Sequence, residues 1–403
     1  RYTPSERISN LARLSVGRDE IGVNILDAFR FDIELLTLQA RDNLVLRLAD
    51  NLSLETGFDS SLVGFTGLVK APPPPVEGEP PPSDFDPDDF LEQEISGAYS
   101  LDVAPFVEAQ VKVDRLTLVP GLRLDYFGLA NQVSLDPRLS ARYALPRDVT
   151  LKGGAAVVHQ APTFDQVDEV FGNPDLGLQR ALQYSVGVEW RPLEHLRGDV
   201  TLFYKDLQNL VSPTDAMVER GGQMVPMRYD NGGRGRVVGA EVFIEHELSR
   251  GLHGWLSYTL SRAERIDSGM SEARLFDFDQ THILALVASY ALGRNWELGA
   301  RFRLVSGSPD TPIIGSVFRH ESDAYSPIYG EVNSDRLPMF RQLDLRVDKT
   351  WVYDTWRFSA YLSLINATNH ANVEGRTYNY DYSEQGKVTG LPILPVFGVK
   401  GQW

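Results

Sequence analysis

The chain has 403 residues, a formal net charge of -16 at pH 7 and no cysteine. The acidic balance excludes nucleic acid as a partner, because the basic stripe that neutralises phosphates is missing. The lack of cysteine excludes disulfides and thiolate metal sites. A membrane-spanning helix needs about 20 consecutive apolar residues, and the most apolar short stretch, 283–292, is about half that length.

Apolar and polar residues alternate along many segments, which is the period of a β-strand with one apolar face. In 295–305, for example, Trp296 and Phe302 share one face, whereas Arg301 and Arg303 lie on the other. The alternation predicts about seventeen strands. They lie near 8–17, 29–39, 43–50, 52–68, 94–112, 115–127, 133–145, 149–160, 182–191, 196–207, 236–248, 251–262, 281–291, 295–305, 341–350, 354–366 and 392–403, with one helical turn near 163–171. The pattern is weak over 1–69 and strong over 94–403.

Prolines interrupt this pattern. Those of 71–89 remove backbone donors and favour extended polyproline II, so we expect a solvated outer loop over 70–93; the alternative is a docking segment for a partner. The acidic run 84–89 has the alternating oxygen ligands of calcium loops but lacks their glycine and their final Glu, and we expect no metal site. Three single prolines inside predicted strands are interpreted as bulges or rim positions: Pro105, Pro120 and Pro137.

The connections between predicted strands alternate in length. Short turns lie near 145–148, 191–195, 248–251, 293–295 and 351–354, and long polar loops near 161–181, 208–235, 263–280, 306–340 and 367–391. Tight turns at one rim and long loops at the other are typical of a transmembrane β-barrel. Lipid offers the backbone no hydrogen bonds, so only a closed sheet satisfies every backbone group. The sequence therefore predicts an all-β, antiparallel transmembrane β-barrel.

In such a barrel, the polar positions of the strands face the lumen. The lumen-facing candidates are Arg123, Glu189, Glu241, Glu245, Arg301, Arg303, Asp344 and Arg346. Charges there contact a plug, line a water path or meet a ligand, and the simpler alternative is solvation in a wet lumen. Aromatic residues of the outer loops are candidates for stacking on a ligand, with loop-on-loop packing as the alternative. These are Phe318, Tyr325, Tyr329, Tyr378, Tyr380 and Tyr382.

The last nine residues, PVFGVKGQW, alternate strictly up to Trp403. Barrel strands of outer-membrane proteins commonly end in an aromatic residue, and aromatic residues form girdles at both rims of the apolar band. We therefore expect lipid-facing or girdle positions along the apolar faces of the strands. They are Trp190, Trp296, Phe302, Trp356, Phe397 and Trp403.

Catalytic motifs are missing from the sequence. The seven histidines include no zinc-binding pair with a glutamate between, and no Gly-x-Ser-x-Gly elbow occurs. His253 with Ser257 or Ser261 comes nearest to a hydrolase arrangement, but these positions alternate onto the presumed lumen face. We expect no enzyme, no catalytic residue and no cofactor.

Five stretches in order resemble the C-terminal barrel part of TonB-dependent outer-membrane receptors. They are LVPGLRLDYF (118–127), SLDPRLSARYAL (134–145), HQAPTFDQVDEVFGNPDLGLQRALQYSVGVEW (159–190), YDNGGRGRVVGAEV (229–242) and LSLINATNHANVEG (362–375). Gly239 and Glu241 stand where the family places them. Before the strand that contains Tyr184, the family usually has Pro-Glu, whereas this chain has Leu178 and Gln179. The resemblance covers roughly residues 94–403.

The resemblance implies a barrel of about 22 strands filled by an N-terminal plug, which imports scarce nutrients with energy passed through TonB. Residues 1–403 would supply about 17 of those strands and contain no plug-like domain or TonB-contacting segment. We hypothesise the later portion of a receptor, with the plug and first strands cleaved, separately encoded or outside this sequence. The implied partners are outer-membrane lipid, the plug domain and missing N-terminal strands, a TonB-type energy-transducing complex and an unknown ligand. The implied location is the bacterial outer membrane.

Three alternatives stay open at this point. A passive porin-like channel needs no plug and conducts steadily without energy. A receptor-derived barrel that binds or exports a partner protein would retain a polypeptide rather than a small ligand. A soluble all-β binding protein would need no detergent and would have only a small apolar outer face.

Overall fold

The computed structural model describes residues 2–25, 29–72, 90–320 and 323–403. Within these ranges the chain forms one 18-stranded antiparallel sheet and three two-stranded sheets. No helix of these ranges has the length and apolarity that a membrane crossing demands. The proline-rich segment 73–89, with the acidic run 84–89, lies outside the described residues.

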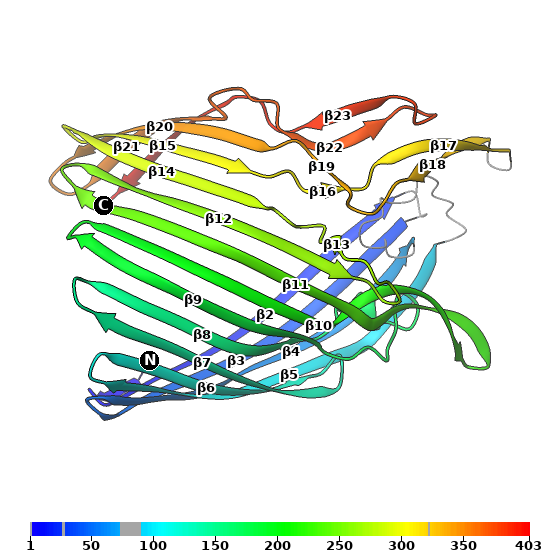
Figure 1. Ribbon diagram of the computed structural model, residues 1–403, viewed down its shortest axis with the longest axis horizontal. Coiled ribbons are helices and arrows are strands. Elements are labelled where there is room, and N and C mark those ends of the chain that lie inside the picture. The colour runs from blue at the N-terminus through cyan, green and yellow to red at the C-terminus, as the bar shows by residue number, and fades with distance from the viewer. Residues whose placement is uncertain (1, 26–28, 73–89, 321–322) are drawn as a thin grey trace.

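The large sheet is an up-and-down meander (Figure 1). Its first strands are β1 (Tyr2–Ser5), β2 (Ile8–Ile25), β3 (Phe29–Ala49), β4 (Leu52–Ala71), β5 (Leu91–Val113), β6 (Leu116–Phe127), β7 (Gln132–Leu145), β8 (Val149–Gln160) and β9 (Gln179–Leu193). It continues through β10 (Leu196–Arg220), β11 (Gln223–Ser249), β12 (Leu252–Ile266), β13 (Arg274–Leu275), β14 (His282–Gly293), β15 (Trp296–Val305), β20 (Phe340–Val352), β21 (Arg357–Ile365) and β24 (Leu394–Gln402).

The small sheets lie in the long connections. They pair β16 (Pro309–Asp310) with β19 (Asp335–Arg336), β17 (Ile313–Arg319) with β18 (Ala324–Tyr329), and β22 (Val373–Tyr378) with β23 (Gln385–Thr389). The single helical turn, α1 (Phe164–Val167), lies where the sequence predicts it.

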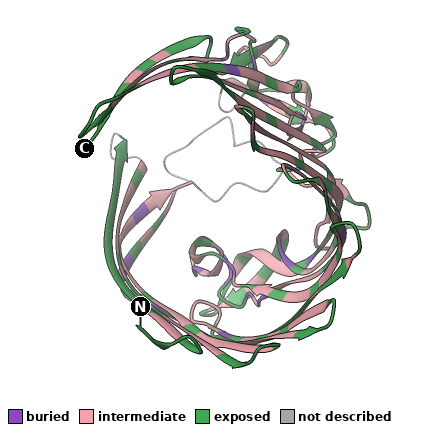
Figure 2. Ribbon diagram, turned by 90° about the vertical axis from the view of Figure 1, so that its left-hand side faces the viewer, coloured by how far each residue is buried: buried purple, intermediate pink, exposed green. Residues whose placement is uncertain are grey.

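The sheet curls into most of a cylinder, with the short turns at one rim and the long loops at the other (Figures 1 and 2). Each large strand pairs with the next one along the chain, up to β21 with β24. Between the described residues, no pairing joins β24 to β1 or β2, and Figure 2 shows an opening between them. Within the described chain, the sheet therefore has two edges.

Tight turns at the short-turn rim use left-handed backbone conformations. Arg294 and Asn295 both have positive φ, 49° and 59°, between β14 and β15. Two consecutive positive φ values make the turn geometry that matches the twist of an antiparallel hairpin. Asn tolerates the left-handed conformation because its side chain can form a hydrogen bond with the nearby backbone. The local sequence therefore determines where this turn lies.

The cross-strand register separates the two faces of the sheet. Leu286, Phe302 and Leu343 lie opposite one another on neighbouring strands, whereas Val287, Arg301 and Asp344 make the adjacent row. The first row belongs to a convex face that leaves many large apolar side chains exposed. Those on the last strands include Leu286, Tyr290, Trp296, Leu298, Leu345, Leu362, Phe397 and Val399. An apolar band of this extent marks a membrane or partner surface rather than a face made for water.

The sequence predicts most strands of the large sheet, and the differences lie mainly in the connections. The predicted strands 29–39 and 43–50 are one strand, β3, because its polar residues 41–43 continue the ladder with β2 and β4. The predicted loops 306–340 and 367–391 contain the three small sheets. The predicted loop 208–235 is instead the far half of a hairpin, since β10 and β11 continue to Arg220 and from Gln223. Its strands pair through several register shifts, which interrupt the alternation of faces, so it escaped detection.

The interpretation of three prolines is wrong. Pro105, Pro120 and Pro137 lie inside β5, β6 and β7, and the β5–β6 and β6–β7 pairings show no register shift. The β5–β6 register skips the positions of Pro105 and Pro120. Pro105 and Pro120 keep their register with the other neighbouring strand, opposite Phe58 and Leu139, whereas the β7–β8 ladder ends at Arg138, next to Pro137. Each proline therefore costs ladder hydrogen bonds without shifting the register.

Candidate functional site

The concave face of the sheet is lined by paired charges. Arg123 Nη1 lies 2.8 Å from Asp59 Oδ2, and its Nε lies 2.9 Å from Asp125 Oδ1. On the later strands, Arg301 Nη2 lies 2.6 Å from Asp344 Oδ2. Charge-assisted pairs at these distances hold long side chains against the wall. The inner wall is therefore polar and largely neutralised pair by pair.

The register places all eight predicted lumen residues on this face. The structure brings two of them together as an ion pair, Arg301 and Asp344. Two more have partners that sequence reasoning did not name: Arg142 for Glu189 and Asp348 for Arg346, both at 2.7 Å. Glu241 and Glu245 lie two positions apart on β11, opposite Thr259 and Trp255 of β12. Whether any of them meets a ligand or a plug stays a prediction.

Several inner-wall pairs were missed. His159 with Asp136 (2.5 Å) joins the neighbouring strands β8 and β7. Arg138 with Glu108 (2.7 Å) reaches across β6, and Lys152 with Asp199 (2.5 Å) reaches across β9. Their strands were predicted, and each residue lies at a polar position of the alternating pattern. Pairs that reach past an intervening strand leave no signal in a comparison of adjacent strands.

Four of the predicted girdle residues lie on the convex face of their strands: Trp190, Trp296, Phe302 and Phe397. Trp356 lies in the turn between β20 and β21, where Trp351, Tyr353 and Phe358 also gather, with ring centroids of Tyr353 and Trp356 4.6 Å apart. Lys349 Nζ lies 5.3 Å from the Trp296 ring. Trp403 follows the end of β24 and is fully exposed. Contact of these residues with lipid stays a prediction.

Aromatic loop residues form two small groups. Phe318 and Tyr325 pack edge to face across β17 and β18 with centroids 5.1 Å apart, and Tyr380 lies 6.0 Å from Tyr325. Tyr378 and Tyr382 make a second pair at 6.0 Å. Tyr329 lies at the end of β18, opposite Ile313 of β17 in the register. Tyr380 is 82% exposed, so the first group presents an open aromatic surface.

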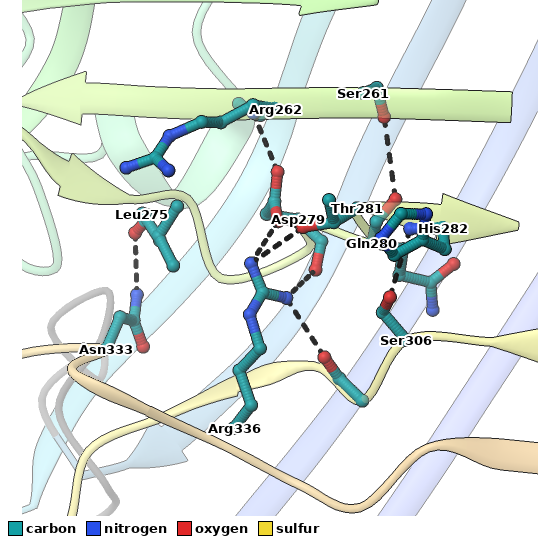
Figure 3. A network of polar contacts seen from close by, with 12 residues as sticks. Ser261, Arg262, Leu275, Asp279, Gln280, Thr281, His282, Ser306, Asn333 and Arg336 are labelled. Carbon is teal, nitrogen blue, oxygen red and sulfur yellow. Dashed lines mark hydrogen bonds and ion pairs between the residues drawn. The ribbon is translucent and has the colours of Figure 1, made fainter.

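Beneath these aromatic groups, a polar network ties the loops together (Figure 3). The side-chain carboxylate of Asp279 is fully buried and bound by Arg336, which also donates to Thr281 Oγ1 and to the Gly307 carbonyl. Asn333 donates to the Leu275 carbonyl at 2.9 Å. The network joins the β12–β14 connection to the β15–β20 connection, and none of its residues was predicted. Their partners are distant in sequence, so no local pattern marks them.

Arg376 on β22 extends this network to the β21–β24 connection. It donates to Asp335 at 2.5 Å, and this hydrogen bond lowers the pKa of Asp335. Its Nη1 lies 2.9 Å from Asp310 Oδ2, an atom that lacks an aligned hydrogen bond. Burial therefore prevails over the nearby charge and raises the pKa of Asp310.

The β8–β9 connection folds into the cylinder (Figure 2) and reaches past β6 and β7 to β4 and β5. We call residues 161–178 the strap. Its Phe164 and Phe171 pack against Phe65, Val69 and Ile95 of β4 and β5. The other end is held by backbone and side-chain hydrogen bonds, including Asn231 with the backbone of Gly177. The strap thus spans part of the lumen beneath the long-loop rim.

Metal and cofactor sites find little support in this wall. Groups of three or more His, Asp or Glu side chains placed to hold a metal ion are absent from the described ranges. His253 pairs with Ser289 in the β12–β14 register, on the concave side with Ser257 and Ser261.

Comparisons with known proteins agree with this architecture. The family model described as TonB dependent receptor-like, beta-barrel matches residues 7–369. The crystal structure of a mutant ferric enterobactin receptor, PfeA, from Pseudomonas aeruginosa aligns with a TM-score of 0.68 and 16% identity, covering 98% of this chain and 59% of that one. The copper transporter OprC aligns with a TM-score of 0.65 and 16% identity, covering 98% and 62%.

The pyoverdine receptor FpvA from Pseudomonas aeruginosa PAO1 aligns with a TM-score of 0.65 and 14% identity, covering 97% of this chain and 58% of that one. The chain thus spans about three-fifths of the length of these structures, and at such identities the likeness shows the fold. No match was found among curated proteins. The family match extends over most of the chain, and the meander has the same architecture: the protein belongs to the TonB-dependent receptor-like β-barrel family.

Proposed function

We propose that the protein serves as a bacterial outer-membrane receptor that binds an external ligand and moves it across the outer membrane. The observation that carries this proposal is the two-sided sheet, apolar on its convex face and ion-paired on its concave face. Such a sheet can contact lipid with its apolar outer face, and water, a plug or a ligand with its polar inner face. The chain acts by binding and conformational change, without making or breaking bonds.

The two sheet edges support a second part of the proposal. The outer edge of β2 beyond residue 10 and the outer edge of β24 have no strand partner among the described residues. In the hydrocarbon core of a membrane, each backbone group without a hydrogen bond costs roughly several kcal/mol. We propose that further strands complete the barrel between β24 and β2, that a plug domain fills it, and that a TonB-type complex supplies energy.

Uptake and conductance together test the function. The full-length protein is expressed in a bacterial host, and uptake of labelled ferric enterobactin, ferric pyoverdine and copper is measured with and without a protonophore. We expect uptake of one of these to depend on the energised inner membrane, and no steady conductance in planar bilayers. Steady conductance without an energy source would instead identify a porin-like channel, and recovery in the soluble fraction would identify a soluble binding protein.

A further inference from the structure

Arginines gather on the convex face of the sheet, at the end of the apolar band that lies nearest the long loops. Arg236 of β11 and Arg262 of β12 share one carboxylate, that of Glu264, each with an N–O distance of 2.6 Å. The two arginine side chains are 62% and 63% exposed, whereas the Glu264 side chain is only 11% exposed. Two cations on one anion leave a positive charge at the surface.

The strand register places these arginines directly beyond the apolar row. Tyr204 and Val238 are opposite each other on β10 and β11, and both are exposed on the convex face. Arg262 lies opposite Val238, and Arg236 lies two residues nearer the long loops. Long loops lie outside the cell in bacterial barrels, and the apolar band contacts acyl chains. In an outer membrane, the arginines would therefore lie at the level of the lipid headgroups.

Two further arginines extend the group without carboxylate partners. Arg234 is exposed on the same face of β11, and Arg180 of β9 donates to the neutral Gln208 at 3.1 Å. Within the part of the chain that the structure describes, neither forms an ion pair. The only further carboxylate on these described rows is Asp206, opposite Arg236. Four arginines and two carboxylates leave an excess of two positive charges, in a chain whose net charge is -16. We call Arg180, Arg234, Arg236 and Arg262 the arginine cluster.

The convex face of the first strands lacks such an excess. Arg18 of β2 pairs with Glu34 of β3 at 2.8 Å, and Arg30 pairs with Asp32 at 2.6 Å. The Arg18 side chain is 63% exposed, as Arg262 is, but each of these two arginines has a carboxylate of its own. Exposure alone therefore does not distinguish the arginine cluster. Its distinctive property is the surplus of cations over carboxylates beside an apolar surface.

The donors of the arginine cluster suit phosphate oxygens. Arg262 binds Glu264 through Nε, so its two terminal amino groups remain for another acceptor. The planar guanidinium matches the geometry of phosphate and binds it through two hydrogen bonds at once. A phosphate monoester carries a charge of about -1.5 to -2 at pH 7, which complements the excess of two positive charges.

We propose that the arginine cluster binds the phosphorylated headgroup of a membrane lipid, whose acyl chains lie along the apolar band beside Val238. The adjoining apolar surface favours a lipid over a free phosphate ion, which has no apolar part to place there. The inference rests on the proposed outer-membrane location and names the lipid chemistry that this part of the convex face takes.

Lipid A, a glycolipid with phosphate groups, and its dephosphorylated form test the site. Binding of each to the delipidated full-length protein in detergent is titrated by native mass spectrometry. Charge-assisted hydrogen bonds predict a roughly tenfold or greater preference for the phosphorylated form. Arg262→Gln and Arg234→Gln should each weaken its binding roughly fivefold. Arg262→Gln leaves Glu264 paired with Arg236, so the sheet should fold. Arg18→Gln is the matched control on the same face and should bind as the wild type does.

Several results would overturn the lipid site. Equal binding of the two lipid forms by the wild type contradicts it, as does unchanged binding in folded Arg262→Gln and Arg234→Gln variants. An equal loss in Arg18→Gln would assign the effect to the overall charge of the protein. Displacement of lipid A by an equal concentration of inorganic phosphate would identify a site for soluble anions instead. Preference for the phosphorylated lipid without energised uptake would retain the site and contradict the transport function, whereas energised uptake without the preference would do the reverse.

Discussion

Phe65 on β4 and Phe164 at the start of α1 stack with ring centroids 5.1 Å apart and planes inclined by 20°. The two residues are about a hundred positions apart in sequence, and their contact holds the strap against β4, four strands away from β8 in the sheet. Phe171, Val69 and Ile95 complete the buried cluster. This apolar cluster on an otherwise polar wall holds the strap at one position within the lumen.

Cysteines placed at Phe65 and Phe164 should cross-link under mild oxidation. The chain has no cysteine of its own, so the engineered pair is unique. Phe164→Ala, which loses part of a stacked aromatic contact worth about 2 kcal/mol, should make the strap cleave faster in limited proteolysis. A cysteine pair at Phe65 and Phe278, whose rings stack on other partners, serves as the control. Equal cross-linking of the two pairs would contradict the strap placement.

Arg336→Met should loosen the long loops strongly. It leaves the fully buried Asp279 carboxylate without its cation, and removing one partner of a buried pair costs about 3 to 5 kcal/mol. Hydrogen exchange should rise in the segments 263–281 and 306–339. Arg319→Met, at an exposed position of β17, is the matched control and should change exchange little. Unchanged exchange in Arg336→Met would show that the loops do not depend on this network.

Acid should separate the β21–β24 connection from the β15–β20 connection. The pKa of Asp335 is lowered by its hydrogen bond from Arg376, so the pair stabilises the contact above the ordinary aspartate pKa of about 3.9 and is lost as pH falls through the lower folded value. The pKa of Asp310 is raised by burial. The folded arrangement therefore favours the protonated form of Asp310, and acid does not break the contact through this residue. We therefore expect the contact to hold down to about pH 4 and to fail in stronger acid.

Spin labels at Arg319→Cys and Thr389→Cys would follow this separation as a distance that increases at low pH. Asp335→Asn should show the longer distance already at neutral pH and should lack the acid transition. Asp310→Asn should keep the short distance at neutral pH. An acid transition that persists in Asp335→Asn would assign it to another group.

Gly239→Ala should destabilise the folded sheet. A Cβ at Gly239 would lie 2.4 Å from the Phe203 ring and 2.7 Å from the Leu260 carbonyl oxygen, and the backbone of β12 cannot retreat. Overpacking of this kind costs about 1 to 3 kcal/mol. Gly299→Ala meets its nearest atom, Arg346 Cβ, at 3.8 Å and serves as the control. Equal urea midpoints for the two variants would contradict the close approach.

Single-tryptophan variants should separate the two faces of the sheet. In vesicles of brominated lipid, fluorescence of Trp296 should be quenched, because an outer-face indole touches acyl chains or the interface. Trp255 pairs with Glu245 on the concave face and should be quenched little. Stronger quenching of Trp255 than of Trp296 would reverse the assignment of faces.

The sequence by itself determined the strands, their faces and the two unlike rims. Alternation at 295–305 puts Phe302 and Arg301 on opposite faces whatever the strand pairs with, because successive side chains of a strand point to opposite sides. The same local rule predicted the alternating strand of Trp403 and the helical turn near 163–171. It failed for Pro105 and for the 208–235 hairpin, where neighbouring strands rather than local pattern decide the conformation.

Only the tertiary structure decided which residues meet. Phe65 and Phe164, Asp279 and Arg336, and Asp335 and Arg376 join segments whose partners are chosen by the curvature of the sheet and the course of its loops. None of these contacts leaves a periodic pattern in the sequence. Alternation records only whether a residue faces in or out, whereas a contact across the cylinder depends on distance in space, which strand pairing sets for the whole chain at once.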